Sequence, residues 1–428
     1  MPPPAITFHN LCQFPAPVPD LESALHRWES SMDYDIAIIG AGPAGLSFAL
    51  SLRDSGLKVA IIEKQPADTL QAPAYDGREI ALTHLSQKLM HAHGSWQRLG
   101  DGNIHPLMAA SVLNGRSDYR LHFDAPANIK GPLGYLVSNQ NIRRAIFAEF
   151  AASEAATLLD NTNVQHVRTD ASGGYITLDN GTTLSASLVI AADTRFSATR
   201  NQMGIASDYN DYGRSALLCV MEHEQPHHHT ALECFFYGGT LAVLPLDEYR
   251  CSVVITVNSA QVSELLQMSE EAFNNEVAQR LGNRLGSMKQ CGERYHYPLV
   301  GVHARKFYGE RFALVGDAAV GMHPVTAHGF NLGLSGQDLL ASEIMKACKN
   351  QRPFWDTQVL AAYQQQHMPN ARVLYHGTNT VVGLFTDDRL PARLLRTAVL
   401  RISNHLPPLK QAIRHKLMSE QHPRLRVF

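Results

Sequence analysis

The hydrophobic pattern near the start of the chain predicts a strand, a helix and a second strand. Residues 33–39 (DYDIAII) end in an apolar run with β-branched side chains, and residues 58–63 (KVAIIE) contain a similar run, as expected of buried parallel strands. Between them, residues 43–55 are predicted to form a helix that stops at Gly56. This order is that of a βαβ unit, the building block of parallel sheets.

Later apolar runs extend this picture to a second kind of sheet. Residues 187–192 (SLVIAA) and 311–315 (RFALV) resemble further buried strands of the parallel sheet. Residues 201–297 instead alternate between apolar and polar positions, most clearly at 241–246 and 251–257, which is typical of an antiparallel sheet. The predicted fold class is therefore α/β, with a Rossmann-like domain and an interleaved antiparallel-sheet domain.

Composition and charge narrow the class of protein. Of the 428 residues, 45% are hydrophobic and 18% are charged, as in a soluble globular enzyme of two interlocked domains. The net charge of -2 gives no general attraction to nucleic acid, so no nucleic-acid partner is expected.

Cysteine and histidine usage does not indicate a metal site. The six cysteines are scattered without C-x-x-C spacing, and with no secretory signal a reducing cytoplasm is the expected compartment. The run from His227 to His229 invites a metal interpretation, but adjacent side chains on a strand point to opposite faces. No metal is expected.

A glycine-rich turn follows the first strand and predicts a dinucleotide site. Gly40 permits the tight turn, Gly42 lets the backbone approach a pyrophosphate, and Gly45 allows close packing of helix on strand, while Ala44 completes the G-x-G-x-x-G pattern. The second strand ends in Glu63, which is placed to bind ribose hydroxyls. The alternative is a glycine-rich turn without a ligand.

A second motif resembles that of the single-component flavin hydroxylases related to p-hydroxybenzoate hydroxylase. Residues 316–338 read GDAAVGMHPVTAHGFNLGLSGQD, close to the second FAD motif of this family. The resemblance implies that Asp317 binds the ribityl hydroxyls, and that Pro324 and the backbone of residues 329–332 lie against the isoalloxazine ring. The candidate FAD-binding residues here are Gly316, Asp317, Pro324, Gly329, Phe330 and Asn331. Two departures are Val320, where the family has His, and Ala327-His328, where it has Gly-Gln.

Three further segments are similar to this family. In the Tyr75–Ser86 segment, the resemblance implies that Arg78 pairs with the FAD pyrophosphate. Asn139 belongs to a segment that places an amide near the cofactor. In the middle motif Asp193 is kept as a cofactor-binding candidate, but the usual glycine is Thr194, which disfavours a positive φ and so indicates a changed turn or a changed reductant contact.

Within the family, the chain looks most like the ubiquinone-biosynthesis hydroxylases, in the branch that includes demethoxyubiquinol 5-hydroxylases. The resemblance implies an FAD-dependent monooxygenase that hydroxylates the aromatic ring of a prenylated phenol or quinol. It uses NAD(P)H and O2 and acts through a flavin C4a-hydroperoxide. The alternatives are an FAD-dependent prenyl-lipid reductase and a non-catalytic FAD-bearing subunit of a quinone-synthesis complex.

The catalytic candidates are three side chains near the flavin loop or in the antiparallel region. His323 and His328 flank the loop and could act as acid, base or orienting groups, or simply be hydrogen-bonded loop residues. Tyr237 could line the substrate pocket, although a packed core aromatic is the alternative.

The resemblance also divides the chain into regions. Residues 1–31 are a Pro-rich extension that is expected to be disordered. The other boundaries are 32–100, 133–200 and 298–350 for the FAD-binding domain, 101–132 and 201–297 for the substrate-binding domain, and 351–428 for a helical C-terminal region. Residues 390–418 carry six Lys and Arg side chains among Leu and Ile. Two interpretations remain open. The segment is either a helical cap, or a surface that contacts the inner face of the cytoplasmic membrane or a quinone-synthesis complex.

Overall fold

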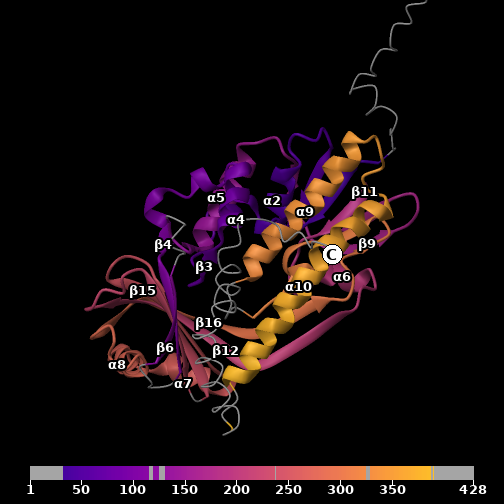
Figure 1. The fold of residues 1–428 in the computed structure, drawn as a ribbon. Helices are drawn as coiled ribbons and strands as arrows, with labels where there is room; N and C mark the ends of the chain where they lie inside the picture. The colour runs from indigo at the N-terminus through magenta and orange to yellow at the C-terminus, as the bar shows by residue number, and fades with distance from the viewer. Residues whose placement is uncertain are drawn as a thin grey trace, which may run out of the picture. The chain divides into compact units, whose positions relative to one another are not determined.

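The computed structural model describes residues 32–114, 119–124, 131–236, 238–323, 328–386 and 389 (Figure 1). The predictions for residues 1–31, Tyr237, Pro324 and residues 390–428 therefore lie outside the described residues.

A mixed sheet of eight strands forms around the predicted βαβ unit. Its central strands β18, β11, β1, β2 and β8 are parallel neighbours, while β17 pairs antiparallel with β18, and β10 joins β9 to β11. The strand bounds are β1 Tyr34–Ile39, β2 Val59–Ile62, β8 Thr157–Leu159, β9 Val164–Thr169, β10 Gly174–Leu178, β11 Thr183–Ala191, β17 Tyr308–Gly309 and β18 Phe312–Leu314. All four residues of β2 and all three of β18 are buried, which explains their uninterrupted apolar sequence.

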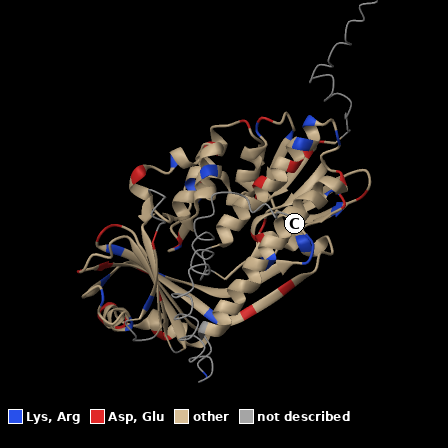
Figure 2. Ribbon diagram, viewed as in Figure 1, with Lys and Arg blue, Asp and Glu red and all other residues tan. Residues whose placement is uncertain are grey.

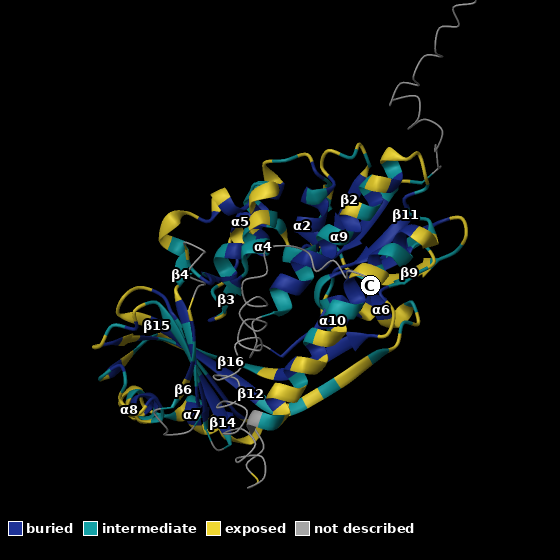
Figure 3. Ribbon diagram, viewed as in Figure 1, coloured by how far each residue is buried: buried dark blue, intermediate teal, exposed yellow. Residues whose placement is uncertain are grey.

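Helices cover this sheet and make the larger hydrophobic core with it (Figure 3). The helix bounds are α2 Pro43–Ser51, α3 Ala67–Gln71, α4 His84–Ala92, α5 Asn139–Ala151, α6 Ala198–Gln202, α9 Gly329–Lys349 and α10 Thr357–Thr386. Helix α2 packs against both α5 and α9, and α9 packs against α10. The predicted helix after the glycine turn is four residues too long, because it ends at Ser51 and turn residues follow.

The second large sheet is antiparallel apart from one parallel pair of strands, β5 with β13. Its order is β19-β16-β12-β15-β14-β13-β5-β6. The bounds are β5 Ala109–Asn114, β6 Arg120–Asp124, β12 Ser207–His223, β13 Thr230–Phe236, β14 Gly239–Pro245, β15 Arg250–Asn258, β16 Met288–Ala304 and β19 Val320–Gly321. One face packs on α7 (Val262–Gln267) and α8 (Glu270–Arg280) through a separate apolar core.

A small sheet of three strands joins the two parts of the chain. It has the order β3-β7-β4, with β3 at Glu79–Leu82, β4 at His105–Leu107 and β7 at Gly134–Ser138. Charged side chains of both signs are interspersed over the described part of the chain, in keeping with the near-zero net charge (Figure 2).

Candidate active site

Three sequence motifs meet at the carboxyl ends of the adjacent strands β1, β11 and β18. The Ala192 N–H donates to the Ile39 carbonyl (2.8 Å), and the Val315 N–H donates to the Ala191 carbonyl (3.0 Å). The glycine turn, the middle motif and the second FAD motif therefore begin side by side, although 276 positions separate Gly40 from Gly316. This edge of a parallel sheet is where ligands bind in open α/β folds.

Each glycine of the turn meets a different steric requirement. Gly40 has a φ of +108°, and a Cβ there would lie 2.6 Å from the Ala192 carbonyl oxygen. A Cβ on Gly45 would lie 2.0 Å from the Gly40 carbonyl oxygen. Gly42, the residue that precedes α2, has open space around its Cβ position. The open side of the turn therefore lies at the amino end of a helix, where backbone N–H groups attract phosphate.

Glu63 is held beside this turn. Its Oε2 accepts a hydrogen bond from the Ala41 N–H (2.7 Å) and its Oε1 accepts one from the Gln65 N–H (2.9 Å). Both oxygens keep a lone pair for another donor, since a carboxylate offers about four acceptor positions. The structure thus orients the carboxylate at the place where the sequence predicts ribose recognition.

A recess next to the turn is lined in part by a positively charged side chain, Arg143, which belongs to none of the sequence motifs. It is lined by Ala41, Pro43, Leu46, Leu70, Arg143 and Phe147. Arg143 lies in α5, one turn after Asn139. Its guanidinium therefore lies near the amino end of α2, where it could bind a phosphate. The sequence does not predict this position, because an arginine in a helix can face any neighbour.

The second FAD motif packs directly on the first. Gly316 has a φ of +61°, and a Cβ there would lie 2.7 Å from the Ala44 Cβ. A Cβ on Gly333 would lie 3.2 Å from the Gly316 Cα, so α9 runs close to this turn. Helix α9 starts at Gly329, so residues 329–332 form its first turn. Phe330 is partly buried against the main core.

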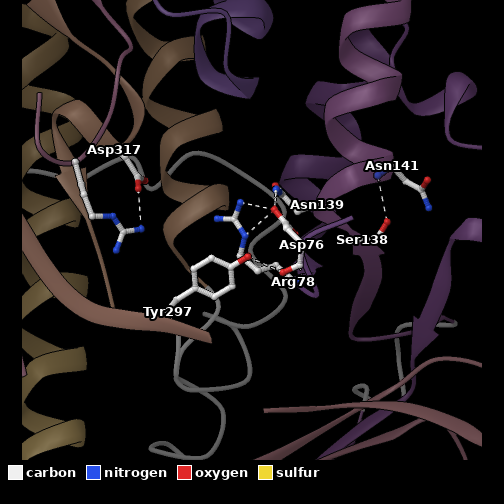
Figure 4. A network of polar contacts seen from close by, with 8 residues as sticks. Asp76, Arg78, Ser138, Asn139, Asn141, Tyr297 and Asp317 are labelled. Atoms are coloured by element: carbon white, nitrogen blue, oxygen red, sulfur yellow. Dashed lines mark hydrogen bonds and ion pairs between the residues drawn. The ribbon is translucent and has the colours of Figure 1, made fainter. Parts of the chain in front are cut away.

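Asp317 follows Gly316 and forms an ion pair that the sequence does not predict. Its Oδ2 accepts from the Arg195 guanidinium at 2.9 Å, and the same guanidinium donates to the Val300 carbonyl at 3.1 Å. The Asp317 side chain remains 41% exposed, so it can bind a further donor (Figure 4).

The middle motif places a carboxylate and a buried arginine together. Asp193 has one oxygen, Oδ1, that is shielded from water and has no partner in the structure. Arg200 is buried and donates to the carbonyls of Arg195 and Ala318, and burial lowers its pKa while Asp193 opposes that shift. Thr194 is exposed and is not among the residues with a positive φ, so the turn accommodates a threonine without backbone strain.

Arg78 is paired within the protein. Its Nε and Nη2 donate to Asp76 Oδ2 at 3.0 and 2.5 Å, and the Asn139 amide donates to the same oxygen at 2.8 Å (Figure 4). The guanidinium also lies 5.4 Å from the centre of the Tyr297 ring, whose hydroxyl donates to the Asp76 carbonyl. These contacts lower the pKa of Asp76 against the opposing effect of burial. Arg78 and Asn139 therefore form one network, in which Arg78 is the exposed member.

Next to Arg78 in the sequence lies a partly buried carboxyl, that of Glu79. Burial raises the pKa of Glu79 to about 7, although the Tyr75 hydroxyl donates to its Oε1 at 3.3 Å. The Tyr75 ring meets the Tyr295 ring edge-on, with their centres 5.7 Å apart. The segment between residues 75 and 79 is thus in contact with β16 of the antiparallel sheet.

Asn331 fixes the first turn of α9 to the neighbouring strand and helix. Its Oδ1 accepts from the Thr83 N–H (3.0 Å) and the Ser86 hydroxyl (2.6 Å), and its Nδ2 donates to the Ala81 carbonyl (2.8 Å). The amide is therefore used to position the helix rather than left open to a ligand.

The two candidate histidines lie on either side of the flavin loop. His323 is 4% exposed, and burial, assisted by Arg214, lowers its pKa to about 4, so it is neutral near pH 7. Its ring meets that of Tyr212 edge-on, with the centres 4.8 Å apart. The His328 carbonyl accepts from the Leu332 N–H in the first turn of α9. Among the described residues no group of three His, Cys, Asp or Glu is arranged to hold a metal.

These residues fit FAD. The left-handed Gly40, the open Gly42 and the amino end of α2 form a phosphate cradle, and Glu63 provides the acceptor for ribose. Asp317 and the amino end of α9, which Gly333 allows close to Gly316, provide a second polar region on the same edge of the sheet.

Comparison with known proteins agrees with this reading of the site. The family profile described as "FAD binding domain" matches residues 33–377. The chain is 49% identical over 391 residues to ubiquinone hydroxylase UbiM of Neisseria meningitidis, covering 90% of this chain and 85% of that protein. It is 35% identical to ubiquinone hydroxylase UbiL of Rhodospirillum rubrum, covering 90% and 89%.

A solved structure shows the same fold. The Pseudomonas aeruginosa protein PqsL, determined in complex with 2-aminobenzoylacetate, superposes with a TM-score of 0.72 over 83% of this chain and 97% of its own. The two sequences are 18% identical, so the likeness concerns the fold alone.

Proposed function

The chain belongs to the FAD-binding domain family, and we propose that it is an FAD-dependent monooxygenase of ubiquinone biosynthesis that hydroxylates the aromatic ring of a prenylated phenol or quinol. The observation that carries the proposal is the meeting of three FAD motifs at one edge of the parallel sheet, in a chain 49% identical to a ubiquinone hydroxylase. NAD(P)H and O2 are the co-substrates.

The proposed roles of the side chains follow from their positions. Glu63 accepts from the adenosine ribose, and the amino end of α2, with Arg78 and Arg143, neutralises the pyrophosphate. Asp317 accepts from the ribityl hydroxyls. The amino end of α9 stabilises negative charge on the reduced ring system. FAD held by these residues would supply the redox chemistry by which NAD(P)H and O2 add one oxygen atom to the substrate ring, with the other oxygen atom released as water.

Two features of the chain serve the hydroxylation itself. His323 is neutral at pH 7, so it does not add positive charge beside the flavin loop. Tyr295 and Tyr297 lie on the face of the antiparallel sheet that contacts residues 75–79, together with Ala216, Leu218 and Val254. This mostly apolar face suits an aromatic ring and limits the access of water.

Restoration of ubiquinone in a host that lacks its own ring hydroxylases tests the proposal. The chain is expressed with a ubiquinone precursor supplied, and the quinones are analysed by mass spectrometry. We expect ubiquinone to reappear, and the remaining intermediates to identify the ring positions that are hydroxylated. An FAD-loaded protein that forms no new hydroxylated product would contradict the proposal and favour the reductase or the non-catalytic subunit.

We also propose that the basic C-terminal segment brings the enzyme to an anionic membrane surface, where prenylated substrates are found. Residues 390–418, which lie outside the described residues, include Arg393, Arg396 and Arg401 among Leu and Ile side chains. No helix in the described part of the chain has the length and apolar character needed to cross a bilayer.

Liposome flotation tests this contact. With vesicles that contain an anionic lipid, the full chain should float, and the triple variant R393Q/R396Q/R401Q should float less, by a factor that shrinks as salt is added. Equal flotation of both proteins would exclude an electrostatic role for these arginines. Neutral vesicles serve as the control.

A further inference from the structure

Strand β13 carries a carboxyl group, that of Glu233, to which the proposed function assigns no role. Glu233 is paired in register with Val112 of β5 and Ala242 of β14. Residues opposite one another in adjacent strands point to the same face of a sheet. Following the register across the sheet, the face of Glu233 is shared by Val112, Ala242, Val254, Leu218 and Tyr295.

This face is the one that meets the FAD-binding part of the chain. Tyr295, at the far end of the register row, contacts Tyr75, and Tyr297 donates to the Asp76 carbonyl at 2.8 Å. The next residues on β13, Leu232 and Cys234, point the other way and belong to the core around α7 and α8. Glu233 therefore lies on the face toward the cofactor site.

The surroundings of Glu233 are apolar. Phe235, two residues along the strand and on the same face, forms a cluster with Leu121 and Phe123 of β6. Both register neighbours of Glu233 are apolar as well. Thr240 of β14 acts on the protonation of Glu233 through a hydrogen bond that favours the charged form.

A carboxyl in such a place is costly unless something binds it. The Oε1 atom of Glu233 is shielded from water and has no hydrogen-bond partner among the residues that the structure describes. Burial raises the pKa of Glu233 to about 8, against the smaller opposing effect of Thr240. Buried polar groups without partners are rare in folded proteins, and those with shifted protonation are concentrated at functional sites.

We propose that Glu233 is the residue of the substrate pocket that binds the ring hydroxyl of the phenolic substrate. This inference rests on the proposed function and names the polar contact within it. The phenolic O–H fills the vacant acceptor at Oε1. Burial keeps this carboxyl protonated below about pH 8. Once it is ionised, the phenol shares its proton with the carboxylate, which raises the electron density of the ring that is to be hydroxylated. The proton returns to the phenol oxygen when the product forms, so Glu233 is unchanged after each turnover.

The test compares Glu233→Leu and Glu233→Gln with the parent enzyme. The probes are a ring precursor with a free hydroxyl and its O-methyl ether. The measured quantities are FAD content, NAD(P)H oxidation, and hydroxylated product formed per NAD(P)H. An enzyme site built to bind a hydroxyl discriminates strongly against an analogue that lacks it.

We expect Glu233→Leu to retain FAD within a factor of two, because the residue lies outside the FAD motifs. Product per NAD(P)H should fall at least tenfold with the free phenol, and the preference for phenol over ether should collapse from about a hundredfold to a few-fold. In the parent, kcat/KM for the phenol should change near pH 8, whereas Glu233→Gln should lack this step. Should Glu233→Leu fail to fold, the pH profile of Glu233→Gln decides.

The matched control is Glu222→Gln, a substitution of an exposed glutamate on β12 of the same sheet, which should behave as the parent. Unchanged product yield, phenol preference and pH profile in both Glu233 variants would overturn the assignment of Glu233 while leaving the proposed function intact. A parent enzyme that hydroxylates neither probe nor any other phenol would instead overturn the proposed function.

Discussion

Two arginines of the site are held in ion pairs within the protein. Arg78 is bound by Asp76, and Arg195 is bound by Asp317. Binding of a pyrophosphate would draw Arg78 from a carboxylate whose pKa is already lowered by the contact. Asn139 also donates to Asp76, so this carboxylate would keep one hydrogen bond when the Arg78 side chain moves from Asp76 to the pyrophosphate. The pairs thus keep the cations in place without burying an uncompensated charge.

A buried histidine outside the site should control how stability depends on pH. His93 is 4% exposed, and burial is the main cause that lowers its pKa to about 4. Because its pKa is lower in the folded state than the usual value near 6.5, the unfolded chain takes up a proton first as the pH falls. Stability should therefore be unaffected above about pH 6.5 and decline between pH 6.5 and pH 4.

The substitution His93→Leu should remove this part of the decline. Between pH 7 and pH 5 the parent should lose about 2 kcal/mol more unfolding free energy than the variant, a value that follows from about 1.4 kcal/mol per pKa unit. Urea unfolding of both proteins at the two pH values measures the difference. A stability gap that does not change with pH would show that His93 is not the titrating group.

At the scale of single residues, the sequence identifies residues that belong to a motif, but it does not identify the residues that contact them in the fold. Glu63 and Asp317 are recognisable because each stands at a fixed distance from a glycine pattern. Arg143, Arg195 and Glu233 are not, because their positions near the site depend on which strands and helices become neighbours. The roles of the recognised residues remain predictions, while their meeting at one edge of the sheet is observed.

At the scale of the elements, two glycines of the same turn have different roles, Gly45 in the packing of the fold and Gly42 in ligand binding. A Cβ at Gly45 would collide with the Gly40 carbonyl, so Gly45→Ala should destabilise the chain itself, by roughly 1–3 kcal/mol. A Cβ at Gly42 meets only open space, and its φ of -70° suits alanine, so Gly42→Ala should fold normally. However, its methyl group would occupy the place of a phosphate and weaken FAD binding, by about tenfold or more.

Thermal unfolding of the FAD-free proteins and titration with FAD distinguish the two variants. A Gly42→Ala protein with parental FAD affinity would mean that the pyrophosphate does not approach this turn. A Gly45→Ala protein with parental stability would mean that the helix and strand are not packed as closely as described.

The parallel strands were predictable because they are short, apolar and bounded by turn residues. The predicted strand at 33–39 corresponds to β1, the one at 58–63 to β2, and the one at 311–315 to β18. The 17-residue strands β12 and β16 were not delimited, since their sequences alternate irregularly and their pairing includes register shifts. The contacts of Asn331 with residues 81–86 depend on the tertiary structure, so no local pattern in the sequence reveals them.

At the scale of the whole described chain, the two large sheets differ in how their faces are buried. The parallel strands are covered on both faces and bring the FAD motifs together at one edge. The antiparallel sheet buries one face against α7 and α8 and turns the other toward residues 75–79. The division of the chain into domains at particular residues stays a prediction. The edge where the FAD motifs meet and the sheet face that we propose for the substrate belong to different sheets.

The origin of the oxygen atom in the product tests the central claim most directly. The FAD-loaded enzyme is given NAD(P)H and a phenolic ubiquinone precursor under ¹⁸O₂ in ordinary water, and the product is analysed by mass spectrometry. A monooxygenase should place one ¹⁸O atom in the new ring hydroxyl, with one NAD(P)H oxidised for each product formed. A product without ¹⁸O, or NAD(P)H oxidation that gives only a reduced prenyl compound, would contradict the account.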